Sequence, residues 1–340
     1  MTESPSQKNF FFIRPIDLQS LFKYRHILYY LASNYKNIYI MPSNFDFTHL
    51  FLANIHFIKP SDAQKYIENS LFYGGSLNDD ILNDLDLSND MIEQYKQKSA
   101  IIINHLGLGD LINFCGAVNY ISENYDNVFI VTYKKNYHAT KTLYLPNPKV
   151  NIIDIHTDND LWNNKEDTWS PMFQTILPYF EKEYRTGIYL NKKKPCIPIP
   201  LCFYEELDIP ISVRKAHFRV PSTKESKELY APFANKQYIF VQQKSSTKTL
   251  NLIHWDKYKI LTLDPNINVY KKGDEYYELA ESIVNKPFFE YTELIQNAEE
   301  IYTIDSAFGM YAYHLPNVKA KVKKMVERDS EEEMVNYFYN

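Results

Sequence analysis

The segment from residue 101 to 133 places the strongest constraint on what this chain can fold into. An apolar run at residues 101–104 is followed by a loop at 105–110, by apolar residues at helical spacing, and by a second apolar run at 128–133. Short apolar runs of this kind are typical of strands that are buried on both faces. A strand, a loop, a helix and a strand in this order form a βαβ unit. The pattern therefore predicts a parallel sheet and an α/β fold.

The same unit holds three of the chain's few glycines. Only 8 of the 340 residues are glycine, and Gly107, Gly109 and Gly116 lie together here. In so glycine-poor a chain, we expect the glycines that are present to serve the backbone, for example where it approaches a ligand closely. His105, Gly107 and Gly109 are therefore predicted to form a loop that contacts an acceptor or a phosphate. A purely structural role for His105 is the alternative.

The spacing of these glycines disfavours two common nucleotide-binding motifs. A dinucleotide fingerprint requires a third glycine three residues after the second, and Ile112 stands at that position. The acidic residue that would bind a ribose after the next strand is also missing, because Lys134 and Lys135 follow it. A P-loop is excluded because no Gly-Lys-Ser/Thr sequence is present.

What the loop does offer is a carboxylate, that of Asp110, at the end of a predicted parallel strand. Ligands bind at the carboxyl ends of strands in such sheets. An aspartate side chain has an ordinary pKa of about 3.9, so it is ionised at neutral pH and can act as a general base. The alternative is that Asp110 only caps the helix that we expect over residues 111–124.

A second α/β series begins near residue 238. Its apolar runs predict strands, and its amphipathic segments predict helices: strands at 238–242, 267–270 and 301–304, and helices at 275–285 and 291–299. A polar loop at 244–251 carries Lys244 and Lys248. Prolines are dense over residues 190–221, which favours an extended crossing between two domains.

The strand at 301–304 runs into a tight turn and a helix start at residue 306. A helix N-terminus presents N–H groups and a positive dipole end, which suits a phosphate. The hydroxyl of Ser306 adds a further polar group, and Asp305 is placed to accept hydrogen bonds from sugar or ribose hydroxyls. A helix cap without any ligand is the alternative here as well.

Composition limits the classes of function. The formal net charge is −5, from 37 basic and 42 acidic residues, which argues against a nucleic-acid partner. No apolar run is long enough for a membrane span, and no leader peptide is recognisable. Cys115, Cys196 and Cys202 form no CxxC pair, so neither a disulfide framework nor a zinc site is expected. These features favour a cytoplasmic protein.

The two motifs, in this order, resemble those of the heptosyltransferase family of GT-B glycosyltransferases. That family has a Gly-Asp loop that opens a helix in its first domain, here residues 108–112, and a sequence like Asp-Ser-Gly-x-x-His-x-Ala in its second, here residues 305–312. The similarity extends over residues 289–312 and covers roughly residues 100–320. Ala307 replaces the usual glycine, Met310 replaces the usual histidine, and about 97 residues precede the Gly-Asp loop's domain.

The resemblance implies two Rossmann-type domains that face a cleft, with an additional N-terminal region. We expect an accessory α/β region over residues 1–97, an acceptor-side domain over 98–220, and a nucleotide-sugar-binding domain over 221–340. The last domain would end in a C-terminal helix beginning near residue 319, where the chain is basic. Contact of this basic segment with a membrane surface is left open.

By the same resemblance, the chain would be an inverting, metal-independent glycosyltransferase of hexosyl or heptosyl type. Asp110 would be the general base, and the acceptor would be a glycan or glycolipid. No cofactor is implied beyond a nucleotide-diphosphate sugar as donor substrate. The residues that would bind the donor are Lys244, Lys248, Asp305, Ser306, Ala307 and Gly309. Lys248 is preferred to Lys244 for the phosphate, and a solvated loop charge is the alternative for either.

Three alternatives stay open at this stage. The departures at Ala307 and Met310 would suit a carbohydrate- or nucleotide-binding protein without catalysis. A different α/β enzyme, such as a nucleotide-sugar epimerase or a methyltransferase, is the second. A metal-dependent GT-A transferase is the third, because residues 84–86 and 158–160 match Asp-x-Asp, although such triplets arise by chance in a chain rich in Asp.

Overall fold

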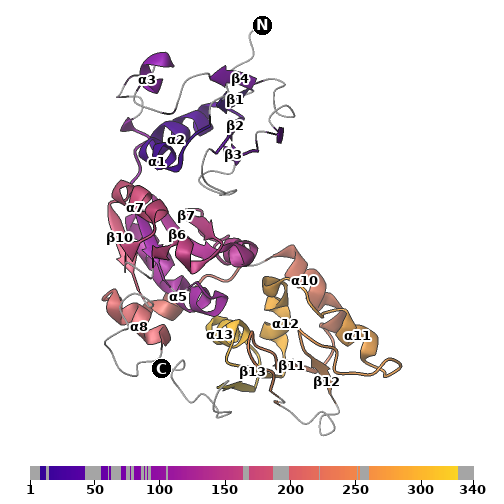
Figure 1. Ribbon diagram of the computed structural model, residues 1–340. Coiled ribbons are helices and arrows are strands. Elements are labelled where there is room, and N and C mark those ends of the chain that lie inside the picture. Colours follow the sequence, from indigo (N-terminus) through magenta and orange to yellow (C-terminus); the bar gives the residue numbers. More distant parts are fainter. Residues whose placement is uncertain are drawn as a thin grey trace. The chain divides into compact units, whose positions relative to one another are not determined.

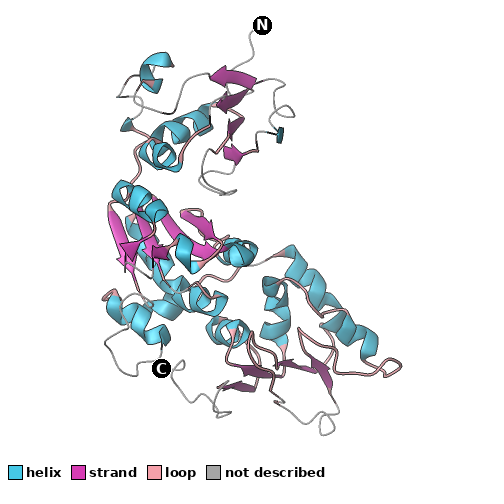
Figure 2. Cartoon of the chain, viewed as in Figure 1, coloured by secondary structure: helices cyan, strands magenta, loops and turns pink. Residues whose placement is uncertain are grey.

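The computed structural model describes residues 8–12, 15–42, 55–59, 61–62, 70–73, 77, 80–85, 88, 90, 93–104, 106–163, 168–186, 199–221, 223–250, 252 and 260–327. Within these residues the strands form three four-stranded sheets and one two-stranded ribbon (Figure 1). Helices alternate with the strands along the chain (Figure 2). Every strand pair in the four-stranded sheets is parallel. The predicted α/β class is confirmed.

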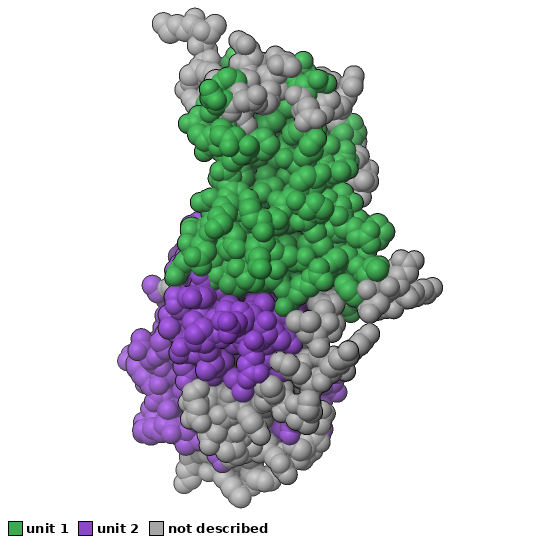
Figure 3. All heavy atoms as spheres, turned by 90° about the vertical axis from the view of Figure 1, so that its left-hand side faces the viewer, with its two compact units in different colours: residues 1–103, 121–137, 149–185 green, residues 104–120, 138–148, 186–340 purple. Residues whose placement is uncertain are grey.

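The chain divides into two compact units, which Figure 3 shows in different colours. Unit 1 comprises residues 1–103, 121–137 and 149–185. Unit 2 comprises residues 104–120, 138–148 and 186–340, so it includes the glycine loop together with the C-terminal sheet. The expected domain boundaries after residues 97 and 220 stay a prediction.

The first sheet of unit 1 has the strand order β3-β2-β1-β4. Its elements are β1 (Asn9–Phe12), α1 (Leu18–Lys23), α2 (Arg25–Asn34), β2 (Asn37–Ile40), β3 (Ile55–Phe57), β4 (Ser70–Tyr73) and the short α3 (Ile81–Asp84). Asp17 caps α1 by accepting a hydrogen bond from the backbone N–H of Ser20. The chain leaves helical geometry at Tyr24, where φ is −106° and ψ is 21°, so α1 and α2 are separate helices.

The second sheet, also in unit 1, has the order β10-β5-β6-β7. Its strands and the other elements of this part of unit 1 are β5 (Ser99–Ile103), β6 (Asn127–Tyr133), β7 (Val150–Ile155), the ribbon β8 (Trp162–Asn163) and β9 (Thr168–Trp169), α7 (Pro171–Ile176) and β10 (Lys182–Arg185). Helix α6 (Tyr137–Leu143) belongs, except for its first residue, to unit 2. Phe22 of α1 packs against Phe129 of β6 and against Phe180, with ring centroids 5.8 and 5.6 Å apart. This aromatic cluster joins the first helix to the second sheet.

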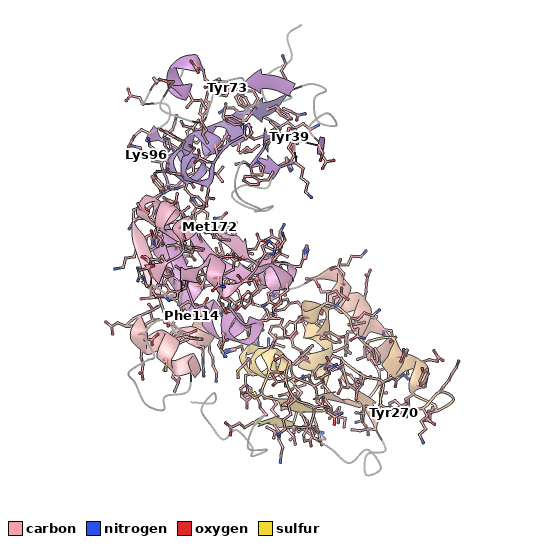
Figure 4. The ribbon with its side chains drawn as sticks, in the orientation of Figure 1. Tyr39, Tyr73, Lys96, Phe114, Met172 and Tyr270 are labelled. Carbon is pink, nitrogen blue, oxygen red and sulfur yellow. The ribbon has the colours of Figure 1, made fainter. Side chains whose placement is uncertain are left out.

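The third sheet lies in unit 2 and has the order β12-β11-β13-β14. The elements of this unit are α5 (Leu108–Ile121), α8 (Ile199–Glu206), α9 (Val213–Ala216), α10 (Lys224–Tyr230), β11 (Tyr238–Gln242), β12 (Leu261–Leu263), α11 (Tyr277–Glu281), α12 (Thr292–Asn297), β13 (Glu300–Ile304), α13 (Ala307–His314) and β14 (Val322–Val326). Phe114 of α5, labelled in Figure 4, packs edge-on against Phe203 and Tyr204 of α8, with ring centroids 5.7 and 6.1 Å apart.

The strand predicted at residues 267–270 is wrong, because the neighbour of β11 is β12 at Leu261–Leu263. The reason is local. The side chain of Asn268 accepts a hydrogen bond from the backbone N–H of Tyr270, and the hydroxyl of Tyr270 accepts one from the N–H of Thr262. Such side-chain bonds offer the backbone an alternative to a strand ladder.

The expected C-terminal helix is also wrong over the described residues. Residues 322–326 form β14, which pairs in parallel with β13, and Met325 is buried. Residues beyond 327 lie outside the described part of the chain.

The proline-rich segment is not extended throughout. Residues 199–206 and 213–216 are helical as α8 and α9, while residues 187–198 lie outside the described part. Pro200 stands in the first turn of α8, where the missing N–H of proline has no helical partner to lose. A high density of prolines therefore did not prevent a helix here.

Gly116 provides a test of how α5 packs. A Cβ atom at this position would lie 2.6 Å from the carbonyl oxygen of Arg214 and 2.8 Å from that of Val213, both of them backbone atoms of α9. We expect Gly116→Ala to lower the free energy of unfolding by about 1–3 kcal/mol, because α9 would have to shift.

The matched control is Gly109→Ala on the same helix. A Cβ atom there would meet its nearest atoms at 3.6 Å, which is ordinary contact. Alanine also has the better helix propensity, by about 1 kcal/mol, so this variant is expected to melt at or above the wild-type temperature. Equal melting temperatures for the two variants would contradict the packing described for Gly116.

Candidate functional site

Two turns follow strands at points where the strand order reverses. In the second sheet β10 and β6 flank β5, and Leu106 and Gly107 lead into α5 after β5. In the third sheet β12 and β13 flank β11, and the turn at Asp305 and Ser306 follows β13. Ligands of doubly wound sheets bind outside the carboxyl ends of the strands at such reversal points. Both turns were singled out from the sequence.

The two turns meet within unit 2. A Cβ atom at Gly109 would lie 3.6 Å from both N and Cα of Ala307, so the two backbones approach closely. About one turn further along α5 and two turns further along α13, Nε2 of His314 lies 2.8 Å from Oδ1 of Asn113. The helices α5 and α13 therefore lie side by side and run in the same direction (Figure 1). Their N-termini are adjacent.

Adjacent N-termini have an electrostatic consequence. The helix α5 has 14 residues and α13 has 8, and each carries a partial positive charge at its first turn. Two such ends at one place favour an anion, and a phosphate group is the usual ligand of a helix N-terminus. The sequence predicted the second of these helix ends as a phosphate site but expected the first to begin later.

Asp110 lies in the first turn of α5. The helix begins at Leu108, three residues before the predicted start, and its first hydrogen bond runs from Leu111 N to Gly107 O over 3.0 Å. Asp110 is half-buried. A Cβ atom at Gly107 would lie 2.8 Å from Oδ2 of Asp110, so the carboxylate folds back over Gly107. A carboxylate in the first turn stabilises a helix N-terminus. Asp110 lies inside α5, however, and not before its first residue as the N-cap alternative expected.

Ser306 precedes α13 but its side chain does not cap the helix. Its hydroxyl instead donates to Oε1 of Gln242 over 2.7 Å. Gln242 is the last residue of β11 and is buried, and its Nε2 donates to the carbonyl of Lys244. Two hydrogen bonds therefore connect the turn after β13 with the loop after β11.

The loop that carries the two candidate lysines is a tight turn. Ser245 N donates to Lys248 O over 2.8 Å, and Lys248 N donates to Oγ of Ser245 over 2.9 Å. Lys244 is exposed and Lys248 is half-buried. Gln242 bonds both the carbonyl of Lys244 and the hydroxyl of Ser306, so the main chain of Lys244 lies near Ser306. The roles of the Lys244 and Lys248 ammonium groups as phosphate ligands stay predictions.

Packing explains the glycine of the second turn. A Cβ atom at Gly309 would lie 2.9 Å from Oγ1 of Thr303 and 3.2 Å from the carbonyl of Ile304, so Gly309 lets α13 lie directly on β13. Asp305 is half-buried and its backbone N–H donates to Val326 O over 2.8 Å. Ala307 faces Gly109. His105 lies outside the described residues.

Two buried amides were missed from the sequence. Asn104 follows β5 directly and is 1% exposed, and its Nδ2 has no hydrogen-bond partner among the described residues. Gln242 ends β11 in the same way. In both cases the available signal was a polar residue at the end of an otherwise apolar run, which marks the carboxyl end of a buried strand.

The Asp-x-Asp triplets are used in local structure. Asp158 accepts a hydrogen bond from the hydroxyl of Tyr133 over 2.5 Å. Asp160 forms a capping box with Thr157. Asp84 accepts a hydrogen bond from the hydroxyl of Tyr73 over 2.7 Å, and residue 86 lies outside the described part. Among the described residues no three His, Cys, Asp or Glu side chains gather as a metal site would require. Nor is any described helix long and apolar enough to cross a bilayer.

The fold and the two turns define a doubly wound α/β protein with loops at the reversal points of its sheets. No protein-family model matches this sequence, and no curated protein matches it. Among solved structures the chain is similar to TibC, a bacterial iron-containing dodecameric glycosyltransferase from enterotoxigenic E. coli H10407, at 13% identity and a TM-score of 0.40. The match covers 68% of this chain but only 58% of TibC, less than two thirds of its length.

Two further solved structures are similar to this chain. One is a glycosyl transferase of family 9 from Veillonella parvula, at 12% identity, with a TM-score of 0.41 and coverage of 67% of this chain and 85% of that one. The other is the ADP-heptose LPS heptosyltransferase II of E. coli, at 10% identity, with a TM-score of 0.38 and coverage of 67% and 90%. These structures include heptosyltransferases, the family whose motifs the sequence resembles.

His314 adds a pH-sensitive group next to the site. Burial, together with the charges of Arg214 and Lys215, lowers the pKa of His314 from 6.5 to about 3. In the unfolded chain the imidazole titrates near its ordinary value. Between these two pKa values the unfolded chain binds more protons than the folded one, so stability falls as the pH falls below about 6.5.

We predict that His314→Gln reduces this sensitivity to acid. One pH unit corresponds to about 1.4 kcal/mol, so at pH 5 the buried imidazole is expected to cost about 2 kcal/mol relative to pH 7.5. Thermal unfolding at the two pH values measures the difference, with the exposed His138→Gln as the matched control. If both variants lost stability in acid as the wild type does, His314 would not be the cause.

Proposed function

We propose that this chain is a nucleotide-sugar-dependent glycosyltransferase that inverts the anomeric centre without a metal, with Asp110 as its general base. One observation carries the proposal: the turn that holds Asp110 packs against Ala307 at the N-terminus of α13. A carboxylate and an anion-binding helix end therefore belong to one compact unit. Transfer from a sugar diphosphate needs both, because a hydroxyl must be deprotonated while a diphosphate leaves.

The reaction is a displacement at the anomeric carbon. Asp110 takes the proton of the acceptor hydroxyl as that oxygen forms its bond to the anomeric carbon of the sugar. The bond between this carbon and the phosphate oxygen breaks at the same time, and its electron pair leaves with the nucleoside diphosphate. With a single displacement on the face opposite the leaving group, the configuration at the anomeric carbon inverts.

The leaving diphosphate gains negative charge as the bond breaks. Helix N-termini and basic side chains stabilise such charge without a metal ion. In this chain the first turn of α13 supplies backbone N–H groups. Ser306 supplies a hydroxyl whose proton turns from Oε1 of Gln242 to the phosphate when the donor binds. Lys248, or Lys244 as the alternative, adds positive charge from the loop after β11. Asp305 binds sugar or ribose hydroxyls.

The other expectations belong to the same proposal. The acceptor is a glycan or glycolipid, and it approaches the loop of His105, Gly107 and Gly109. The enzyme works in the cytoplasm. Where the acceptor is a glycolipid, the enzyme contacts a membrane surface. The donor sugar is a hexose or a heptose on a nucleoside diphosphate.

Asp110→Asn tests the assigned base. Asparagine is also favourable near a helix N-terminus, so the variant is expected to fold, but it cannot accept the proton. We expect kcat to fall about 10²–10⁴-fold while the affinity for the nucleoside diphosphate stays within about threefold of the wild type. Ser306→Ala is the matched variant. It should raise the donor KM about tenfold and leave kcat nearly unchanged, because the lost hydrogen bond to the phosphate is made both in the bound donor and in the transition state.

The assay uses UDP-, GDP- and ADP-sugars, with NMR of the product to read the anomeric configuration and a chelator added to test for a metal. Unchanged transfer by Asp110→Asn would remove this residue as the base. Retention of configuration, or loss of activity with the chelator, would overturn the corresponding part of the proposal.

A second candidate function is binding of a nucleotide or carbohydrate without catalysis. The placement of the Asp110 carboxylate over Gly107 favours it, because a carboxylate held at a helix N-terminus needs no reaction to explain it. Thermal stabilisation by a nucleoside diphosphate, without turnover of any donor in the panel, would support this function. Stabilisation by S-adenosylmethionine alone would instead point to a methyltransferase.

A further inference from the structure

We infer that Asn113 and His314 form a positioning pair that fixes the direction of Asp110 relative to the phosphate end of α13. The inference rests on the proposed function, since it concerns the same site. Neither residue belongs to the turns themselves, because Asn113 lies within α5 and His314 is the last residue of α13. Each lies about one helical turn or more beyond the place where α5 and α13 first meet, and both are buried.

Asn113 lies three residues after Asp110 on α5, so the two side chains share one side of the helix. It is 1% exposed and bonded in two directions. Its Oδ1 accepts a hydrogen bond from Nε2 of His314 over 2.8 Å, and its backbone carbonyl accepts one from the hydroxyl of Tyr204 over 2.8 Å. The side chain of Asn113 thus faces α13, and its main chain is held by α8.

His314 is the last residue of α13 and is held firmly in place. It is 6% exposed, and its ring stacks on Phe218 with centroids 5.1 Å apart and an interplanar angle of 26°. Because Oδ1 of Asn113 can only accept, the Nε2 atom of His314 must carry the proton. The bond therefore has one polarity, and only a donor at this place can satisfy the amide oxygen.

Two contacts constrain a helix more than one does. The approach of Gly109 to Ala307 sets the distance between the N-termini of α5 and α13. Phe114 against α8 and Gly116 against α9 hold the middle of α5, so the part that can still adjust is its first turn, which carries Asp110. The bond from His314 to Asn113 joins α5 to α13 directly after that turn and limits its movement. Positioning of this kind matters because a displacement of about 1 Å in a reacting group costs on the order of 100-fold in rate.

The test compares variants that remove different bonds of the same residue. In Asn113→Leu, which keeps the volume but not the amide, we expect kcat to fall about 10- to 100-fold with the donor KM within about threefold. Tyr204→Phe is the matched control, because it removes the other bond to Asn113 and leaves the one to His314. It should lower the melting temperature but keep kcat. His314→Gln, which retains a donor, should keep most of the rate that His314→Leu loses.

These outcomes separate positioning from general stability. If Tyr204→Phe lost as much kcat as Asn113→Leu, or if Asn113→Leu kept full kcat, the inference would be overturned. It would also fail if His314→Gln were as slow as His314→Leu while folding normally.

Failure of the proposed function shows itself differently, as absence of transfer by the wild type with every donor. The pair is then judged by hydrogen exchange in the full chain. Asn113→Leu must speed exchange in the first turn of α5, at residues 108–111, more than Tyr204→Phe does. Equal exchange in the two variants would show that the bond to His314 does not hold that turn.

Discussion

The close approach of α5 to α13 is the contact on which the candidate site depends. At Gly109 the first turn of one helix comes within van der Waals distance of the backbone of Ala307 in the other. A large side chain at either position would push the N-termini of α5 and α13 apart. The positive end of α13 would then lie further from the carboxylate of Asp110. The alanine that stands where the resembled family has glycine is still small, so this departure is compatible with the contact.

Three glycines at or near the two turns are required by the packing for different reasons. Gly107 leaves room for the carboxylate of Asp110, Gly116 lets α9 cross α5, and Gly309 lets α13 lie on β13. None of these three explanations needs a ligand. In the proposed function, the chemistry therefore comes from the side chains and helix ends near these glycines, above all Asp110 and Ser306.

The sequence predicted those parts of the structure whose causes are local. The runs that became β6 and β11 are mostly apolar and were placed within a residue. Residues 267–270 have a similar composition, but Asn268 bonds to its own neighbours and the segment forms no ladder. The family resemblance implied a C-terminal helix beginning near residue 319, yet residues 322–326 pair with β13, a partner that local periodicity does not reveal.

The same division applies to the site. Asp110 and Ser306 were found because each stands in a short motif after a predicted strand. Gln242, Asn113 and His314 were not found, because each acquires its role from a partner far away in the sequence: the bond between His314 and Asn113 spans 201 residues. A single sequence shows that such residues are polar within apolar surroundings, and only the fold shows what they bind.

A buried polar pair of this kind is better explained by position than by stability. Two apolar side chains of similar volume would pack between α5 and α13 without the cost of removing an amide and an imidazole from water. They would also permit several rotations of the helices, because apolar contact has no direction. The bond from His314 to Asn113 permits one arrangement, and a departure from it would leave the amide oxygen buried without a partner. The chain therefore gives up some stability in acid at His314, and in return the carboxylate of Asp110 keeps one direction.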